Sequence, residues 1–124
     1  MGFKFENLEV WKLSLEYIDA IYEMAARLPK EELFNLRSQW VRAATSIALN
    51  IAEGSTGQSD SEQGRFLGYA IRSLIESTAC FRIAQRRMYI IDEREELEDR
   101  TVTLVKKLQS FRNTVQGKEN ASQR

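Results

Sequence analysis

Residues that break helices are scarce in this chain of 124 residues, and long helical patterns run between them. Pro29 is the only proline, and the 6 glycines are confined to a few places. Between these breaks, apolar residues recur three and four positions apart, which is the spacing of one face of an α-helix. The pattern predicts four amphipathic helices, over about 7–28, 35–53, 59–88 and 92–116.

Each predicted helix has one main apolar row. In the first helix the row comprises Leu8, Trp11, Leu15, Ile18, Tyr22 and Ala25. In the second it comprises Leu36, Trp40, Ala43, Ala44, Ile47 and Ile51. In the third it comprises Phe66, Ala70, Ser73, Ser77, Phe81, Ala84 and Met88, and in the fourth Leu97, Thr101, Leu104, Leu108, Phe111 and Val115. Gly64 and Gly68 interrupt the third helix, either because another helix, such as the second, approaches closely there or because the surface tolerates them.

Helices of this kind joined by short links predict an all-α fold, an up-down-up-down four-helix bundle. Ser59 followed by Glu62 is the signature of a helix start, with the serine as N-cap. Gly117 ends the last apolar pattern, and the residues after it lack apolar anchors. We therefore expect one domain over 1–116 and a disordered C-terminal tail over 117–124.

The second predicted helix carries a polar row beside its apolar row. Arg42, Ser46, Asn50 and Glu53 follow one another at steps of four, four and three, so their side chains share a helix face. Hydroxyl and amide groups among small alanines indicate a half-buried face, and polar groups removed from water need hydrogen-bond partners. We interpret the row as a structural hydrogen-bond network that fixes the helix register. The alternative is a ligand-binding or catalytic row.

Gly54 follows this row and is expected to end the helix in the left-handed conformation that glycine adopts without steric cost. Glu53 lies in the last helical turn, where the helix dipole disfavours a carboxylate. We therefore expect Glu53 to contact an arginine of another helix or backbone amides of the loop over 55–59. The alternative is a solvated carboxylate.

Composition excludes several classes of function. The chain has 18 basic and 18 acidic residues, no histidine and one cysteine, Cys80. An internal disulfide and a zinc site built from histidine and cysteine are impossible, and the commonest general base is missing. We expect no catalytic residues, no metal and no cofactor. Neither a membrane-spanning run nor a signal peptide is evident, so we expect a cytoplasmic protein.

Arginines gather in the third predicted helix and could form a local basic patch. The candidate nucleic-acid-binding residues are Arg37, Arg65, Arg72, Arg82, Arg86 and Arg87. The planar guanidinium suits phosphate because it donates two parallel hydrogen bonds. The alternative, which we favour, is a set of surface arginines that pair with glutamates and contribute little energy.

Several segments of the chain resemble the four-helix-bundle proteins encoded in intervening sequences of 23S ribosomal RNA genes, the S23 family. The likeness covers about 5–90. The matching residues are Phe5-Glu6-Asn7-Leu8-Glu9-Val10-Trp11-Lys12, Leu28-Pro29, Glu32, Leu36, Arg42-Ala43-Ala44-Thr45-Ser46-Ile47, Asn50-Ile51-Ala52-Glu53-Gly54, Ser59, Glu62, Phe66-Leu67, Ala70, Ser73-Leu74 and Glu76. The chain departs from the family in having Ala48 where proline is common. It also has Thr56, Gly57 and Gln58 where a basic residue is common, which weakens a nucleic-acid role.

The resemblance implies a bundle that assembles as a ring-like homopentamer and is related to the accessory variability protein of diversity-generating retroelements. It implies no catalysis. We therefore expect a non-enzymatic oligomeric module associated with RNA or with a nucleic-acid-processing partner. The alternative is a purely structural or protein-binding homo-oligomer. Apolar residues beyond one bundle row are candidates for the subunit interface, namely Leu13, Ile21, Val41 and Leu67.

Overall fold

The computed structural model describes residues 2–57, 59–92 and 94–122, the last five of them by their backbone alone. Within these residues the chain forms four α-helices and two short 3-10 helices, and no strand. The α-helices are α1 (Glu9–Ala25), α2 (Leu36–Gly54), α3 (Asp60–Arg86) and α4 (Arg94–Ser122). The 3-10 helices are η1 (Lys4–Asn7) and η2 (Lys30–Glu32). The all-helical fold is the one that the sequence predicted.

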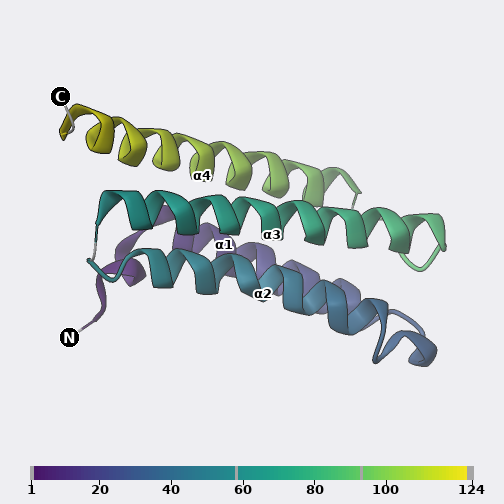
Figure 1. Ribbon diagram of the computed structural model, residues 1–124. Helices are drawn as coiled ribbons and strands as arrows, with labels where there is room; N and C mark the ends of the chain where they lie inside the picture. The colour runs from purple at the N-terminus through teal and green to yellow at the C-terminus, as the bar shows by residue number, and fades with distance from the viewer. Residues whose placement is uncertain (1, 58, 93, 123–124) are drawn as a thin grey trace.

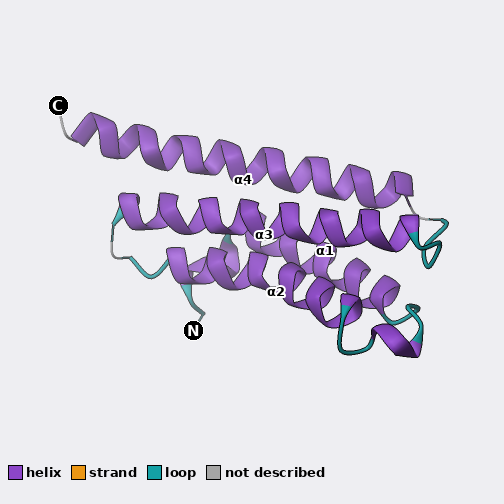
Figure 2. Ribbon diagram, turned by 45° about the vertical axis from the view of Figure 1, so that its right-hand side comes forward, coloured by secondary structure: helices purple, strands orange, loops and turns teal. Residues whose placement is uncertain are grey.

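The four α-helices lie antiparallel to their neighbours, in up-down-up-down order (Figure 1). Consecutive helices pack together, and α1 also packs against α4, which closes the bundle. The start of α1 and the end of α4 lie at one end, whereas η2 and the turn between α3 and α4 lie at the other (Figure 2). None of the described helices combines the length and the apolar character that crossing a membrane requires.

Side chains of all four helices meet in one core. The rings of Trp40 on α2 and Phe81 on α3 lie 6.1 Å apart at its centre, and both are almost fully buried. A buried hydrogen bond of 2.7 Å joins the hydroxyls of Tyr17 on α1 and Ser77 on α3, two helices that face each other across the bundle. Every residue of the apolar row predicted for the second helix is buried, Trp40 included, so this row was predicted correctly.

The apolar row predicted for the first helix is partly wrong. Leu15 and Tyr22 remain 40% and 51% exposed. The buried face instead comprises Val10, Ser14, Tyr17, Ile18, Ile21, Met24 and Ala25. This helix has apolar residues on more than one side, and heptad spacing alone does not tell which side meets the core. The expectation that Ile21 and Leu67 lie at a subunit interface is wrong, because both are buried in the core of a single chain, with 0% and 1% exposure.

The ends of α3 are well defined. The Ser59 side chain accepts a hydrogen bond of 3.0 Å from the backbone N–H of Glu62, as the cap signature predicted. At the other end Met88 adopts a φ of 63°, and the N–H of Tyr89 donates to the carbonyl of Ala84. This left-handed turn ends the helix, and it turns Met88, which the third apolar row had included, out into solvent with 76% exposure.

The predicted end of the fourth helix at Gly117, with a disordered tail after it, is wrong for the residues that the structure describes. The helix α4 continues through Gly117 to Ser122, and residues 123–124 lie outside the described part of the chain. A glycine inside a helix costs about 1 kcal/mol relative to alanine. That cost weakens a helix but does not by itself end one.

Candidate functional site

The predicted polar row meets α3 through a small hydrogen-bond network. Asn50 donates from Nδ2 to the Ser46 carbonyl at 2.9 Å and to the Ser46 Oγ at 3.1 Å. From α3, the Ser73 hydroxyl donates to the same Ser46 Oγ at 2.9 Å. All three side chains are half-buried. The sequence indicated the helix face but missed Ser73 as the partner, because Ser73 was placed in the apolar row of its own helix.

Arg42 and Glu53, at the two ends of the row, do not join this network. Both side chains are exposed, and no hydrogen bond or ion pair joins either of them to another described residue. The expected contact of Glu53 with an arginine or with the loop is therefore absent from the described structure, and the alternative of a solvated carboxylate holds. The polar face of α2 meets α3 at Ser46, whereas Glu53 lines a surface hollow with Phe3, Lys4 and Phe5 of the N-terminal segment.

Gly54 has a different role from the predicted left-handed cap. It is the last residue of α2, it is buried, and Gly57 is the described glycine with a positive φ, of 87°. A Cβ on Gly54 would lie 2.8 Å from Cβ of Phe66 on α3. Glycine therefore permits the close approach of α2 and α3. Gly64 and Gly68 serve a similar purpose, but toward α4, where Gln116 and Arg112 lie against them.

A surface groove with a volume of about 590 Å³ lies along α2 and α3 beside this network. Its α2 wall includes Arg42 and Ser46, and its α3 wall includes Ser73 and Glu76. Phe34, in the turn before α2, also lines the groove and is 92% exposed. Phe34 and Glu76 were not singled out as site residues. Glu76 is among the residues that match the family, but only the placement of the helices brings it to the groove.

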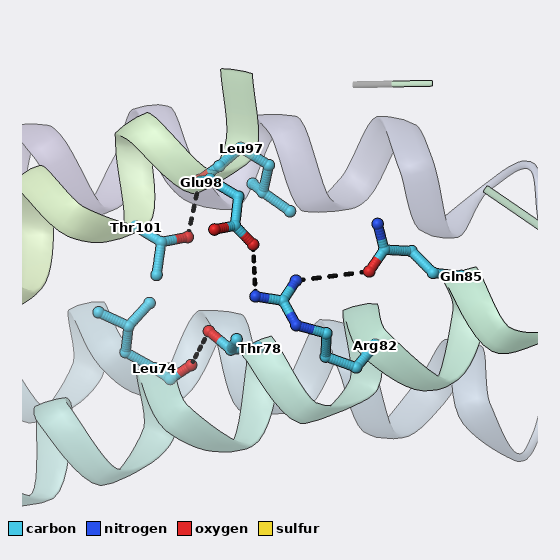
Figure 3. A network of polar contacts seen from close by, with 7 residues as sticks. All are labelled: Leu74, Thr78, Arg82, Gln85, Leu97, Glu98 and Thr101. Atoms are coloured by element: carbon cyan, nitrogen blue, oxygen red, sulfur yellow. Dashed lines mark hydrogen bonds and ion pairs between the residues drawn. The ribbon is translucent and has the colours of Figure 1, made fainter. Parts of the chain in front are cut away.

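The six candidate arginines do not form one patch of free charge. Arg65 pairs with Glu62 on its own helix, and its guanidinium lies 5.7 Å from the centre of the Phe66 ring. Arg82 forms an ion pair with Glu98 on α4 and a hydrogen bond of 3.4 Å to Gln85 (Figure 3). These pairs neutralise part of the charge that the sequence assigned to nucleic acid.

Arg87 belongs to a contact at the end of the bundle that carries η2. Its guanidinium lies 5.8 Å from the Tyr89 ring, and the Tyr89 hydroxyl donates to Glu32 at 3.0 Å. Asn35 also donates to Glu32, at 2.8 Å. The hydrogen bonds from Asn35 and Tyr89 lower the pKa of the Glu32 carboxyl. This contact therefore connects the turn before α2 with the turn after α3.

The side chains of the other three candidates, Arg37, Arg72 and Arg86, have no hydrogen-bond or ion-pair partner among the described residues. Arg72 and Arg86 are exposed on α3, and Arg37 is half-buried near the start of α2. Among the six candidates, these three are the guanidinium groups left without a partner in the described part of the chain. Among the described residues, no cluster of three or more acidic or cysteine side chains is arranged to hold a metal ion.

These features define a small helical-bundle protein with a polar groove between two of its helices. Residues 6–110 match the family model of the 23S rRNA-intervening sequence proteins. The chain therefore belongs to the 23S rRNA-intervening sequence protein family, as its motifs suggested. No curated protein matches it closely enough to add a further relative.

Proposed function

We propose that this protein is a non-catalytic, homo-oligomeric bundle that acts in the cytoplasm and associates with RNA or with a nucleic-acid-processing protein. The observation that carries the proposal is the family match, because it covers residues 6–110 and the family is described by its link to 23S rRNA intervening sequences. A homopentamer is the assembly that the family resemblance implies.

The free arginines support an association with RNA. Arg37, Arg72 and Arg86 have no partner among the described residues and can donate bidentate hydrogen bonds to phosphate. In an oligomer these groups repeat in every subunit, so that individually weak contacts add up. The net charge of the chain is zero, so any binding has to use such a local group.

The environment of Ser46 supports a role without catalysis. A nucleophilic serine requires an adjacent general base. The groups that contact Ser46 are the amide of Asn50 and the hydroxyl of Ser73, neither of which is a base. The chain also has no histidine.

One observation favours the second candidate, a protein-binding or structural homo-oligomer without a nucleic-acid role. Large apolar side chains lie on the outer surfaces of α2 and α3, where Leu49, Ile75 and Ile83 are 62%, 61% and 51% exposed. Exposed apolar groups of this kind favour contact with a second copy or with another protein.

Salt-dependent binding to RNA tests the proposal. We expect a labelled single-stranded RNA to bind at about 50 mM salt and its affinity to fall steeply as salt rises, because bound arginines release counterions from phosphate. Substituting Arg72→Gln and Arg86→Gln should weaken binding and reduce the slope of log K against log salt by about one per arginine. Arg65→Gln is the matched control, since Arg65 already pairs with Glu62. Absence of RNA binding at about 50 mM salt would favour the second candidate.

A further inference from the structure

The hydrogen bond between Ser46 and Ser73 fixes which residues face each other across the groove. The helices α2 and α3 run antiparallel, so one turn before Ser46 on α2 lies beside one turn after Ser73 on α3. These turns carry Arg42 and Glu76. Glu76 therefore lies level with Arg42, and both line the groove. No ion pair joins them, and neither side chain has a hydrogen-bond or ion-pair partner among the described residues.

The two charged side chains of the groove stand on opposite walls, Arg42 on α2 and Glu76 on α3, and Ser38 and Gln39 on the α2 wall can both donate and accept. Arg42 has only donors, and the ionised carboxylate of Glu76 has only acceptors. The Ser46 Oγ already accepts two hydrogen bonds, from Asn50 and from Ser73. Its own proton has no acceptor among the described residues, so Ser46 adds a donor to the wall that carries Arg42. A ligand that engages both charged side chains presents two donors toward Glu76 and acceptors toward Arg42 and Ser46.

Among the four RNA bases, guanine has this arrangement. Its Watson–Crick edge carries the adjacent donors N1–H and N2–H₂, and its other edge carries the acceptors O6 and N7, which arginine binds in a bidentate manner. Adenine and cytosine each place a single amino donor beside a ring acceptor. Uracil has one donor between two acceptors. None of these three matches a carboxylate with two free oxygens.

Two further residues suit a nucleotide. Phe34 lines the groove and is 92% exposed, so its ring is available to stack on a base. Arg72 lies one turn before Glu76 on α3 and is exposed, without a partner among the described residues. Its guanidinium is therefore placed beside the groove for the phosphate that accompanies the base.

We propose that the groove between α2 and α3 binds a guanine base, with Glu76 accepting from N1–H and N2–H₂ and Arg42 and Ser46 donating to O6 and N7. The inference rests on the proposed function, because it names the part of an RNA that the protein recognises. A free guanine nucleotide presents the same base and is the other source of this ligand.

Fluorescence anisotropy with two labelled 12-nucleotide RNAs tests the site. One RNA consists of adenines, and the other has two central guanines in the same context. We expect the guanine-containing RNA to bind about tenfold more tightly, since a bidentate base contact of this kind discriminates by that order. Glu76→Gln should abolish or reverse the preference, because an amide donates as well as accepts and suits adenine. Phe34→Ala should weaken binding to both RNAs by about tenfold, without changing the preference.

Glu16→Gln is the matched control, because it makes the same chemical change at an exposed position of α1. Circular dichroism of each variant verifies that the helix content is unchanged. A guanine preference that survives in Glu76→Gln, or RNA binding without any preference, would overturn the guanine site and leave the proposed function standing. Calorimetry with guanosine and adenosine monophosphates separates the sources. Binding of the guanine nucleotide without RNA binding supports the guanine site and contradicts the RNA association. If neither RNA nor nucleotide binds, both the guanine site and the RNA association are contradicted.

Discussion

At the scale of single residues, Gly54 is the position where a side chain would do most damage. We expect Gly54→Ala to lower the free energy of unfolding by about 1–2 kcal/mol, because the new Cβ would lie 2.8 Å from Cβ of Phe66 and force α2 and α3 apart. This net loss already includes the gain of up to about 1 kcal/mol from replacing a glycine in a helix, which offsets part of an overpacking cost of about 2–3 kcal/mol. Urea denaturation followed by circular dichroism measures the difference.

Gly117 provides the control, since it lies within α4 and a Cβ there would meet no atom within 4 Å. Gly117→Ala should leave stability unchanged or raise it by up to about 1 kcal/mol. Equal effects of the two substitutions would show that packing at Gly54 is unimportant.

Residue roles were only partly predictable from the sequence. The spacing of Ser46 and Asn50 placed both on one helix face, and they do share a network. The roles of Gly54 and Glu53 depended on which side of α2 meets α3, and local sequence does not contain that information. The same reason explains why Glu76 was overlooked, since only the register between two helices brings it level with Arg42.

At the scale of helices, the Tyr17 hydroxyl couples α1 to α3 through its hydrogen bond with Ser77, and the burial of this hydroxyl makes stability depend on pH. Burial raises the pKa of the Tyr17 hydroxyl to about 12, whereas an unfolded tyrosine ionises near 10. Both states are protonated below pH 10, and between about 10 and 12 the unfolded state loses the proton first. We therefore expect this tyrosine to lower the free energy of unfolding by about 1.4 kcal/mol per pH unit over that interval.

Denaturation of the wild type and of Tyr17→Phe at pH 9, 10, 11 and 12 isolates this contribution, because every other ionising group is common to both proteins. At pH 9 the variant should be less stable by about 1 kcal/mol, since Ser77 loses its partner. Above pH 11 Tyr17→Phe should be the more stable of the two proteins, because phenylalanine has no proton to lose on unfolding. Parallel pH profiles would contradict the assignment of the alkaline effect to Tyr17.

Helix existence was easier to predict than helix orientation. The row from Leu97 to Val115 reaches the core much as expected, because α4 has one apolar side. In α1, apolar residues on several sides left the buried face undetermined. The two ends of α3 differ in the same way. Ser59 and Glu62 are residue types typical of a helix start, whereas the left-handed turn at Met88 lacks the glycine that usually marks a helix end.

At the scale of the whole molecule, the exposed apolar side chains of α2 and α3 bear on assembly. Leu49, Ile75 and Ile83 do not contribute to the core of one subunit, and burying them against further copies would be favourable. The family resemblance implies five copies, so light scattering coupled to size exclusion should give a mass near five times that of the 14.4 kDa chain, independent of concentration in the micromolar range. A monomeric mass would contradict the proposed oligomer.

The order in which the helices pack has a kinetic consequence. Each helix lies against the next one along the chain, and the pairing of α1 with α4 is the closure that joins distant parts of the sequence. Local contacts of this kind give a low contact order, for which folding times lie between microseconds and milliseconds. A chain growing from the ribosome can thus dock each hairpin as soon as it is synthesised, with little time for exposed helices to aggregate.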